Sequence, residues 1–166
     1  MPSSLELRVA TLDDAEAIRA IYNVEVETAT VTFDLRGRTL EEQRSWISDR
    51  SGAHAVVVAT DGRTVVGFGS LSPYKDRPAY STTVEDSVYV HREHQGQGVG
   101  HAVLAELCDR AAAHGFHTMI ARIVGDHEAS ISLHARLGFE IVGHEREVGR
   151  KFGRWLDVIV MQKLLG

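Results

Sequence analysis

The sequence contains little cysteine and proline and no long apolar run. Its 166 residues include one cysteine and three prolines. A single cysteine excludes a disulfide within the chain and is typical of a reducing compartment. No apolar stretch reaches the roughly 18 residues of a membrane-spanning helix, and the first residues lack the basic and apolar segments of a signal peptide. We therefore expect a cytoplasmic protein that does not enter membranes.

Excess positive charge and metal-binding motifs are also missing. The 23 acidic residues outnumber the 18 basic residues, which gives a formal net charge of −5. Because nucleic-acid binding depends on clustered basic side chains that displace counterions, this balance argues against a nucleic-acid partner. Nine histidines are present, but none comes with a nearby cysteine or an HExxH pattern. The sequence predicts no metal site.

What is present is the composition of one globular domain. Hydrophobic residues make up 43% of the chain and charged residues 25%. A chain of this length buries a full hydrophobic core as one unit. Because no repeat, low-complexity tract or linker interrupts it, we expect residues 1–166 to form a single domain.

Apolar periodicity predicts a mixture of strands and helices. Thr11 and Asp14 resemble a capping box that opens the first helix, with Ala15, Ile18, Ile21 and Tyr22 on its apolar face. The other expected helices cover 39–49, the stretch from the glycine-rich turn to 114, and 129–137. The expected strands cover 5–9, 54–60, 64–71, 83–91, 118–124, 140–147 and 155–163, the last two joined by a basic loop. These elements predict one α/β body around a mixed sheet.

The most informative motif is the glycine-rich segment Gln95-Gly96-Gln97-Gly98-Val99-Gly100. It follows the alternating run Val84–Val90 and precedes the apolar stretch Val103–Ala113, which predicts a strand, a turn and the start of a helix. Main-chain N–H groups in such a turn, together with a helix N-terminus, favour an anion. Glycines allow a ligand to approach the main chain closely. The motif therefore predicts phosphate binding.

Two common phosphate-binding loops do not fit this segment. A Walker A loop needs a lysine followed by serine or threonine after its last glycine, whereas His101 follows Gly100. A dinucleotide fingerprint needs wider glycine spacing and an acidic residue about 20 residues later, where Met119 and Ile120 stand. The alternatives left are an ordinary strand-to-helix connection and a site for another diphosphate.

The spacing Q-x-x-G-x-G resembles the pyrophosphate loop of the GCN5-related N-acetyltransferases (GNAT). A second motif, Ser130-Ile131-Ser132-Leu133-His134-Ala135-Arg136-Leu137-Gly138-Phe139, resembles the late helix and turn of this family, where an LHxxLGF ending is common. The resemblance implies an α/β fold of the α+β type, with a central, mixed, mostly antiparallel twisted sheet of about seven strands flanked by about four helices. It also implies acetyl-CoA as the co-substrate and no metal.

Longer strings resemble a narrower branch, the phosphinothricin, methionine sulfone and methionine sulfoximine acetyltransferases. They are Thr32-Phe33, Tyr74-Lys75 with Arg77 and Ala79-Tyr80, Thr83-Val84-Glu85, and Gly149–Asp157. The resemblance covers essentially the whole chain. It implies direct acetyl transfer to the α-amino group of a small amino-acid analogue, and a homodimer.

Two residues are expected to take part in catalysis. A free α-amino group is largely protonated near neutral pH, so its attack on a thioester needs a base. The resemblance gives that role to Glu85, directly or through water, and partial burial would raise its pKa into an effective range. The resemblance also places His134 near the amine, where it would relay a proton or orient the substrate. The alternatives are a solvated glutamate and a histidine packed in the core.

The resemblance also assigns residues to the amino-acid substrate. Lys75, Arg77 and Tyr80 match a substrate loop, and their side chains suit a carboxylate and a phosphinyl or sulfonyl oxygen. Phe33 would form an apolar wall. Without the resemblance, the loop residues are ordinary solvated surface and Phe33 is ordinary core.

For acetyl-CoA, the resemblance assigns the main chain of Val88, Tyr89 and Val90 to the pantetheine arm, which would pair as an added strand. The N–H group of Val90 would stabilise the tetrahedral oxyanion. The residues expected to hold the pyrophosphate are Gly96, Gln97, Gly98, Val99, Gly100 and His101. His127 stands where the family commonly has an asparagine that contacts coenzyme A, so it either keeps or loses that contact.

Other functions stay open at this point. A GNAT enzyme can acetylate a protein N-terminus, a polyamine or an aminoglycoside, although the basic loop at Lys75 and Arg77 argues against a polycationic substrate. A non-catalytic acyl-CoA sensor would bind the co-substrate without releasing thiol. The natural amine substrate and a general acid for the departing thiolate are not identified by the sequence.

Overall fold

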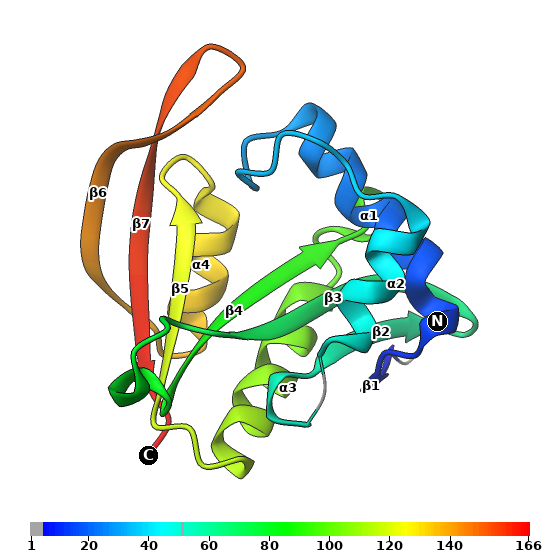
Figure 1. Cartoon of the computed structure of the whole chain (residues 1–166), viewed down its shortest axis with the longest axis horizontal. Helices are drawn as coiled ribbons and strands as arrows, with labels where there is room; N and C mark the ends of the chain where they lie inside the picture. The colour runs from blue at the N-terminus through cyan, green and yellow to red at the C-terminus, as the bar shows by residue number, and fades with distance from the viewer. Residues whose placement is uncertain (1–4, 51) are drawn as a thin grey trace.

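The computed structural model describes residues 5–50 and 52–166 (Figure 1). It contains seven strands: β1 (Leu5–Val9), β2 (Val56–Asp61), β3 (Thr64–Pro73), β4 (Thr83–Val90), β5 (Thr118–Val124), β6 (Glu140–Lys151) and β7 (Arg154–Leu164). The four α-helices are α1 (Ala15–Thr28), α2 (Leu40–Ser48), α3 (Val99–Ala113) and α4 (Glu128–Arg136).

The seven strands form one sheet in the order β1-β2-β3-β4-β5-β7-β6. In the described part of the chain, β4 and β5 are the one parallel pair, and every other neighbouring pair is antiparallel. This confirms the expected mixed, mostly antiparallel sheet with about four helices.

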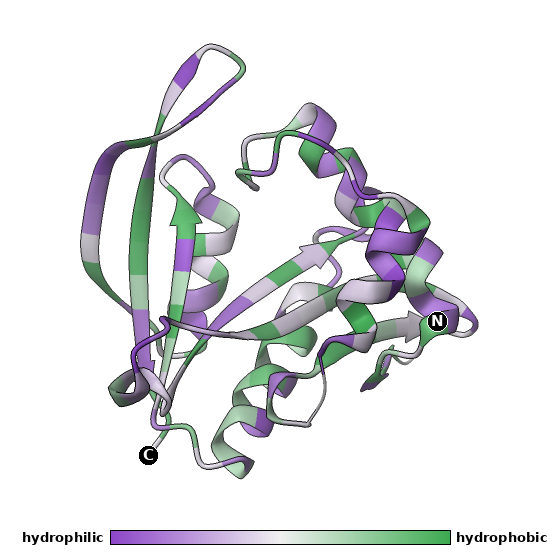
Figure 2. Cartoon of the chain, viewed as in Figure 1, coloured by the Kyte–Doolittle hydropathy of each residue, from purple (hydrophilic) through white to green (hydrophobic). Residues whose placement is uncertain are grey.

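Helices cover both faces of the sheet. On one face, Ile18 of α1 and Ile47 of α2 pack with Val58 and Phe68 of the sheet. On the other face, α3 and the end of α4 cover a larger cluster that includes Leu104. Figure 2 shows apolar residues gathered along the strands and on the helix surfaces that meet them. The two cores pack against both faces of the sheet and hold its strands in place.

Small residues let α3 approach the sheet closely. A Cβ atom added at Gly69 of β3 would lie 2.6 Å from Val103 Cγ1 and 2.8 Å from Leu107 Cδ1. Only glycine leaves room for these two side chains. The start of α3, which follows the glycine-rich turn, is thereby fixed against β3 and β4.

Polar side chains and a glycine set the helix boundaries, and the predicted pair Thr11 and Asp14 is one of them. The Thr11 N–H donates to Asp14 Oδ2 over 2.8 Å at the start of the turn that leads into α1. Thr39 caps α2, and its hydroxyl accepts a hydrogen bond from the Glu42 N–H over 3.1 Å. Gly115, after α3, has a φ of 87° and ends the helix in the left-handed conformation.

Several strand boundaries depart from the prediction, most of them by one or two residues. His54 lies in a short 3-10 turn before β2, β3 extends to Pro73, and β4 ends at Val90. The largest error is the predicted basic loop between the last two strands. Instead, β6 and β7 continue as a hairpin closed by the two residues Phe152 and Gly153, whose φ angles are 51° and 71°. Positive φ at both positions gives the tight turn that matches strand twist.

The sheet splits between β4 and β5. Their parallel pairing covers only Thr83–Thr118, Val84–Met119 and Glu85–Ile120. Beyond Glu85, the two strands diverge, and Figure 1 shows them as the two arms of a V. The fold therefore opens a gap in the middle of its own sheet.

Candidate active site

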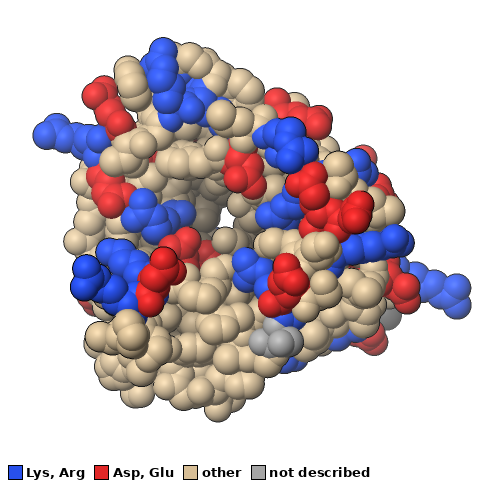
Figure 3. Space-filling view, in the orientation of Figure 1, with Lys and Arg blue, Asp and Glu red and all other residues tan. Residues whose placement is uncertain are grey.

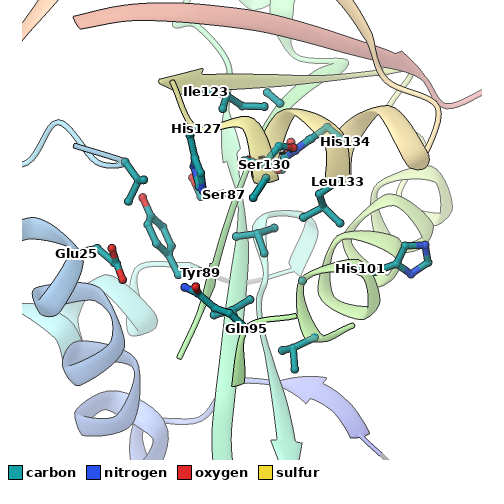
Figure 4. A pocket seen from close by; sticks show the side chains of 18 of the residues that line it. Glu25, Ser87, Tyr89, Gln95, His101, Ile123, His127, Ser130, Leu133 and His134 are labelled. Atoms are coloured by element: carbon teal, nitrogen blue, oxygen red, sulfur yellow. Dashed lines mark hydrogen bonds and ion pairs between the residues drawn. The ribbon is translucent and has the colours of Figure 1, made fainter. Parts of the chain in front are cut away.

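A cavity of about 350 Å³ occupies this gap. Its walls come from β4 after Glu85, from β5 after Ile120, from the glycine-rich turn and from α4. Figure 3 shows this face of the molecule hollowed at its centre, with charged side chains around the hollow. The residues that line the cavity come from elements far apart in the sequence, as Figure 4 shows.

The main chain of β4 faces the cavity with unused hydrogen-bonding groups. The His91 N–H donates to the Val66 carbonyl of β3 over 2.9 Å. Because N–H groups alternate in direction along a strand, those of Val88 and Val90 point away from β3 and into the gap. Within residues 5–50 and 52–166, no strand pairs with β4 on that side beyond Glu85. This edge fits an extended, amide-containing ligand lying alongside it as an additional strand.

The glycine-rich turn closes the end of the cavity nearest Val90. Gly96 and Gly98 have φ angles of 75° and 84°, which favour glycine, and a Cβ atom added at either would meet nothing within 4 Å. Gly98 is the N-cap of α3. The exposed turn and the N-terminus of a 15-residue helix form an anion-binding surface that fits a diphosphate.

The structure brings most of the expected co-substrate residues to the cavity. The wall includes Val88, Tyr89, Val90, Gly96, Gly98, Val99, Gly100, His101 and His127. Gln97 is the exception, because it is exposed and does not line the cavity. Burial lowers the pKa of His127 and outweighs the opposing charge of Glu25, so its ring is neutral near pH 7. A neutral imidazole offers one donor and one acceptor, as an asparagine amide offers both.

Glu85 lies at the closed end of the V, the last position at which β4 and β5 pair. It is partly buried and does not itself line the cavity. Burial raises the pKa of its carboxyl, with a further increase from Asp86, while the positive charge of Arg122 opposes the rise. A carboxylate with a raised pKa is a stronger base than an exposed glutamate.

His134 is buried under the cavity and is paired with Asp86. It donates a hydrogen bond from Nε2 to Asp86 Oδ2 over 2.8 Å and from Nδ1 to the Ser130 carbonyl over 2.7 Å. Burial alone would lower its pKa, but the hydrogen bond and the charge of Asp86 outweigh it, so the pKa of His134 is raised. Both ring nitrogens are therefore engaged. Glu85 and Asp86 are neighbours on β4, so they lie on opposite faces of the strand.

The expected substrate loop lies apart from the cavity within one chain. Lys75, Arg77 and Tyr80 line a separate, shallow pocket with Tyr74. The Lys75 ammonium lies 5.0 Å from the centre of the Tyr74 ring and 5.4 Å from that of Tyr80. The structure thus brings the loop residues together with one another and not with the cavity wall.

Phe33 lies in the α1–α2 loop, where it is 42% exposed. Its ring packs directly on Gly149 of β6. The preceding residue, Thr32, accepts a hydrogen bond at its carbonyl from Lys151 Nζ over 2.9 Å. The loop from one arm of the V is therefore attached to the hairpin of the other arm.

Several residues of the cavity wall were not expected from the sequence, namely Glu25, Asp86, Ser87, Gln95, Arg122, Ser130 and Leu133. Gln95 begins the glycine-rich motif, and Ser130 and Leu133 belong to the second motif, so the motifs could have indicated these three residues as part of the site. Glu25, on α1, is buried and pairs with Arg92 over 3.0 Å. It is brought to the wall by tertiary packing alone.

Comparison with known proteins identifies the family. The acetyltransferase (GNAT) domain matches residues 7–160. The chain belongs to the GNAT acetyltransferase family. Among curated relatives, the phosphinothricin N-acetyltransferase of Streptomyces coelicolor is 41% identical over 164 residues, which cover 95% of this chain and 96% of the relative. The L-methionine sulfoximine/L-methionine sulfone acetyltransferase of Pseudomonas aeruginosa is 39% identical over 161 residues, covering 96% and 94%.

A solved GNAT structure supports the same assignment. The phosphinothricin acetyltransferase of Sinorhizobium meliloti, in complex with acetyl-CoA, superposes with a TM-score of 0.93 and 40% identity, covering 98% of this chain and 89% of that chain. The predicted family, its branch and the GNAT fold are therefore confirmed.

The described residues contain neither a metal-binding cluster nor a membrane-spanning helix. No group of three or more His, Cys, Asp or Glu side chains in this part of the chain is placed to hold a metal ion. None of its helices is both long enough and apolar enough to cross a membrane.

Proposed function

We propose that this GNAT protein transfers the acetyl group of acetyl-CoA directly to the α-amino group of a small amino-acid analogue, such as phosphinothricin, methionine sulfone or methionine sulfoximine. The observation that carries the proposal is the cavity between β4 and β5, with an anion-binding turn at one end and Glu85 at the other. Both curated relatives described above carry names of enzymes that act on such amino acids.

Acetyl-CoA supplies a thioester in this proposal, and the residues of the chain position it. The turn from Gly96 to His101 holds the diphosphate, and the main chain of Val88 and Val90 binds the pantetheine amides. The N–H group of Val90 points into the cavity, where it donates a hydrogen bond to the oxygen that becomes negatively charged during attack. His127, as a neutral donor and acceptor, keeps the contact made by the usual asparagine.

Glu85 is the general base of the proposed reaction. It accepts the proton of the amine, directly or through a water molecule, because burial raises the pKa of its carboxyl. His134 assists by orientation, since both of its ring nitrogens already donate hydrogen bonds. The one cysteine is a poor nucleophile, because burial raises the pKa of Cys108 to about 11. Direct transfer without an acyl-enzyme follows.

The test is a thiol-release assay on the purified protein. The substrates are phosphinothricin, methionine sulfone, methionine sulfoximine, common amino acids and polyamines. We expect release with one of the amino-acid analogues, and kinetics that require both substrates to be bound together. Ping-pong kinetics with an acetylated protein would contradict direct transfer.

The variant Glu85→Gln tests the base. We expect turnover to fall by about 100-fold or more. We also expect the acidic limb of the wild-type pH–rate profile to lie above pH 4.5, the ordinary pKa of this carboxyl, and to be absent in the variant. The variant Glu93→Gln, at an exposed glutamate beyond β4, is the control and should keep wild-type turnover. A loss below threefold in Glu85→Gln would remove Glu85 from the role.

A non-catalytic sensor is the alternative from another class. It predicts that acetyl-CoA binds, as measured by calorimetry, while no amine in the panel releases thiol. Failure of acetyl-CoA to bind at millimolar concentration would contradict both functions.

A further inference from the structure

Arg122 is the one charged residue of β5, and it is exposed although β5 lies in the middle of the sheet. Its two neighbours along the strand, Ala121 and Ile123, are buried. A charged side chain on a central strand normally cannot reach solvent, because helices or other strands cover both faces of the sheet. Arg122 has room because β4 and β5 diverge one position earlier, and it lines the cavity.

The register of the sheet places Arg122 on the same face as Glu85. Glu85 and Ile120 are opposite each other in the parallel pair, so their side chains share a face. Because side chains alternate along a strand, Arg122 returns to that face two residues after Ile120. A cation and the proposed base thus lie diagonally across the closed end of the V. The effect of the Arg122 charge on the Glu85 carboxyl agrees with this placement.

The guanidinium of Arg122 is held by an ion pair with Glu145, which uses only part of its hydrogen-bonding capacity. Its Nη2 donates to Glu145 Oε1 of β6 over 2.5 Å, and the two side chains are 36% and 39% exposed. In the described part of the chain this is its one hydrogen bond, whereas a guanidinium carries five N–H donors in a planar fork. Such a fork binds a carboxylate through two parallel hydrogen bonds.

An α-amino acid carries its amine and its carboxylate on the same carbon. A site that brings the amine to a base therefore also brings the carboxylate close to that base, where a guanidinium is well suited to bind it. Asp86, the next residue on β4, faces the opposite side and is occupied by His134. Lys75 and Arg77 line a separate pocket. Arg136 also lines the cavity, but it stands at the end of α4. Arg122, on β5, is the arginine of the cavity wall that the sheet register places on the same face as Glu85.

We propose that Arg122 binds the α-carboxylate of the amine substrate and so restricts this enzyme to free α-amino acids. The inference rests on the proposed function, because it assumes that the amine is presented to Glu85. It leaves the basic loop at Lys75 and Arg77 for the oxygens at the far end of the substrate.

Carboxylate binding would also strengthen the base. The positive charge of Arg122 lowers the pKa of Glu85, against the effect of burial. A bound carboxylate neutralises that charge, so the pKa of Glu85 rises when the correct substrate is in place. An amine without a carboxylate leaves Glu145 as the one carboxylate paired with Arg122 among the described residues and meets a weaker base.

The test compares three amines in the wild type and in Arg122→Gln: methionine sulfone, its carboxamide, and 3-(methylsulfonyl)propylamine, which lacks the carboxyl group. For each amine, the ratio of kcat/KM between wild type and variant removes the intrinsic reactivity of that amine. We expect Arg122→Gln to lower kcat/KM for the acid by about 10- to 100-fold, mainly through KM, and to change the other two by less than about threefold. Arg122→Lys should retain part of the preference.

Arg110→Gln is the matched control, because Arg110 is similarly exposed, at 31%, and pairs with one glutamate, Glu106, on α3. It should leave all three amines unchanged. An equal loss for the acid and the carboxamide in Arg122→Gln, or no loss at all, would overturn the inference while leaving the proposed function intact. Absence of thiol release from the wild type with every amino acid would instead overturn the proposed function.

Glu145→Gln provides a second route if Arg122→Gln does not fold. It keeps Arg122 and removes the carboxylate that competes for its guanidinium. We expect a lower KM for methionine sulfone and an unchanged KM for its carboxamide. The same change in KM for both amines would contradict carboxylate binding by Arg122.

Discussion

Asp86 and His134 form a buried ion pair whose strength depends on pH. Their side chains are 1% and 3% exposed, and they are 48 positions apart in the sequence. The pKa of His134 is higher in the folded protein than its ordinary value of 6.5. Folding therefore favours the protonated ring. The stabilisation is fully present below pH 6.5 and is lost as the pH rises through the folded-state pKa.

We predict that Asp86→Ala lowers the free energy of unfolding by about 3 kcal/mol at pH 6, because it leaves a buried charge without its partner. The difference from wild type should be smaller at pH 9, where His134 is less protonated. Urea unfolding of both proteins at the two pH values measures it. Asp126→Ala, at an exposed aspartate paired with Arg154, should cost less than about 1 kcal/mol at either pH. A difference that grows with pH would contradict the charged pair.

Among single residues of the site, the sequence identifies only those that belong to local motifs. Gly96 and Gly98 could be predicted because their spacing and their position after a strand are enough to indicate an anion-binding turn. His134 was predicted as a candidate, but its engagement by Asp86 was not, since that contact exists only after α4 packs on β4. Arg122 has no motif around it. Its position in the cavity depends on where two strands separate.

The α1–α2 loop and the β6–β7 hairpin meet across the open end of the V. A Cβ atom added at Gly149 would lie 2.5 Å from the Phe33 ring. Glycine is needed at that position so that the Phe33 ring can approach the strand closely. This contact, with the hydrogen bond from Lys151 to Thr32, holds in place the residue that we propose as an apolar wall for the substrate.

We predict that Gly149→Ala displaces Phe33 and lowers kcat/KM for the amino-acid substrate by about 10-fold. The same change made in a Phe33→Ala background should have little effect, because the clash is gone. A double-mutant cycle on kcat/KM measures this coupling. Gly143→Ala is the control on the same strand, since a Cβ atom there would make an ordinary contact of 3.7 Å with Val160. Equal losses in both backgrounds would show that Phe33 and Gly149 act independently.

Two strands could be predicted to the residue, the alternating β1 and the mostly apolar β5. β1 and β5 begin and end where their patterns do. The second half of β6 could not, because its residues are mostly exposed and polar, and nothing in their order distinguishes an edge strand from a loop. Pairing with β7 makes that segment a strand, and the partner is visible only in the folded sheet.

At the scale of the whole molecule, the β6–β7 hairpin exposes apolar side chains that one chain does not cover. These are Ile141, Val142, Val148, Phe152 and Trp155, each 53% to 60% exposed. Val148, Phe152 and Trp155 form an apolar cluster toward the turn of the hairpin, and Ile141 and Val142 lie at its other end. Exposed apolar side chains on an edge hairpin are typical of an interface between subunits. They support the homodimer that the family resemblance implies.

We predict that the protein in solution has twice the chain mass of 18.3 kDa, measured by light scattering after gel filtration. The double variant Val148→Asp, Trp155→Glu should have the mass of one chain, because it places charges in the apolar cluster. Val9→Glu, at an exposed position of β1 at the other edge of the sheet, should leave the mass unchanged. A wild-type mass near 18.3 kDa at micromolar concentration would contradict the homodimer.

The family and the sheet could be predicted from the sequence, but the cavity could not. Each motif indicates an element and its neighbours along the chain. The cavity instead depends on the early end of the β4–β5 pairing at Glu85 and Ile120. That end is a property of the assembled sheet and is encoded in neither strand alone.

The unpaired main-chain groups of β4 also affect the stability of the folded protein. A ligand lying along Val88 and Val90 adds contacts between the two halves of the protein, beside the short β4–β5 pairing of three residue pairs. A ligand present at 100 times its dissociation constant raises the free energy of unfolding by about 2.7 kcal/mol. We therefore expect resistance to heat and to proteases to rise with the concentration of the ligand that lies along β4.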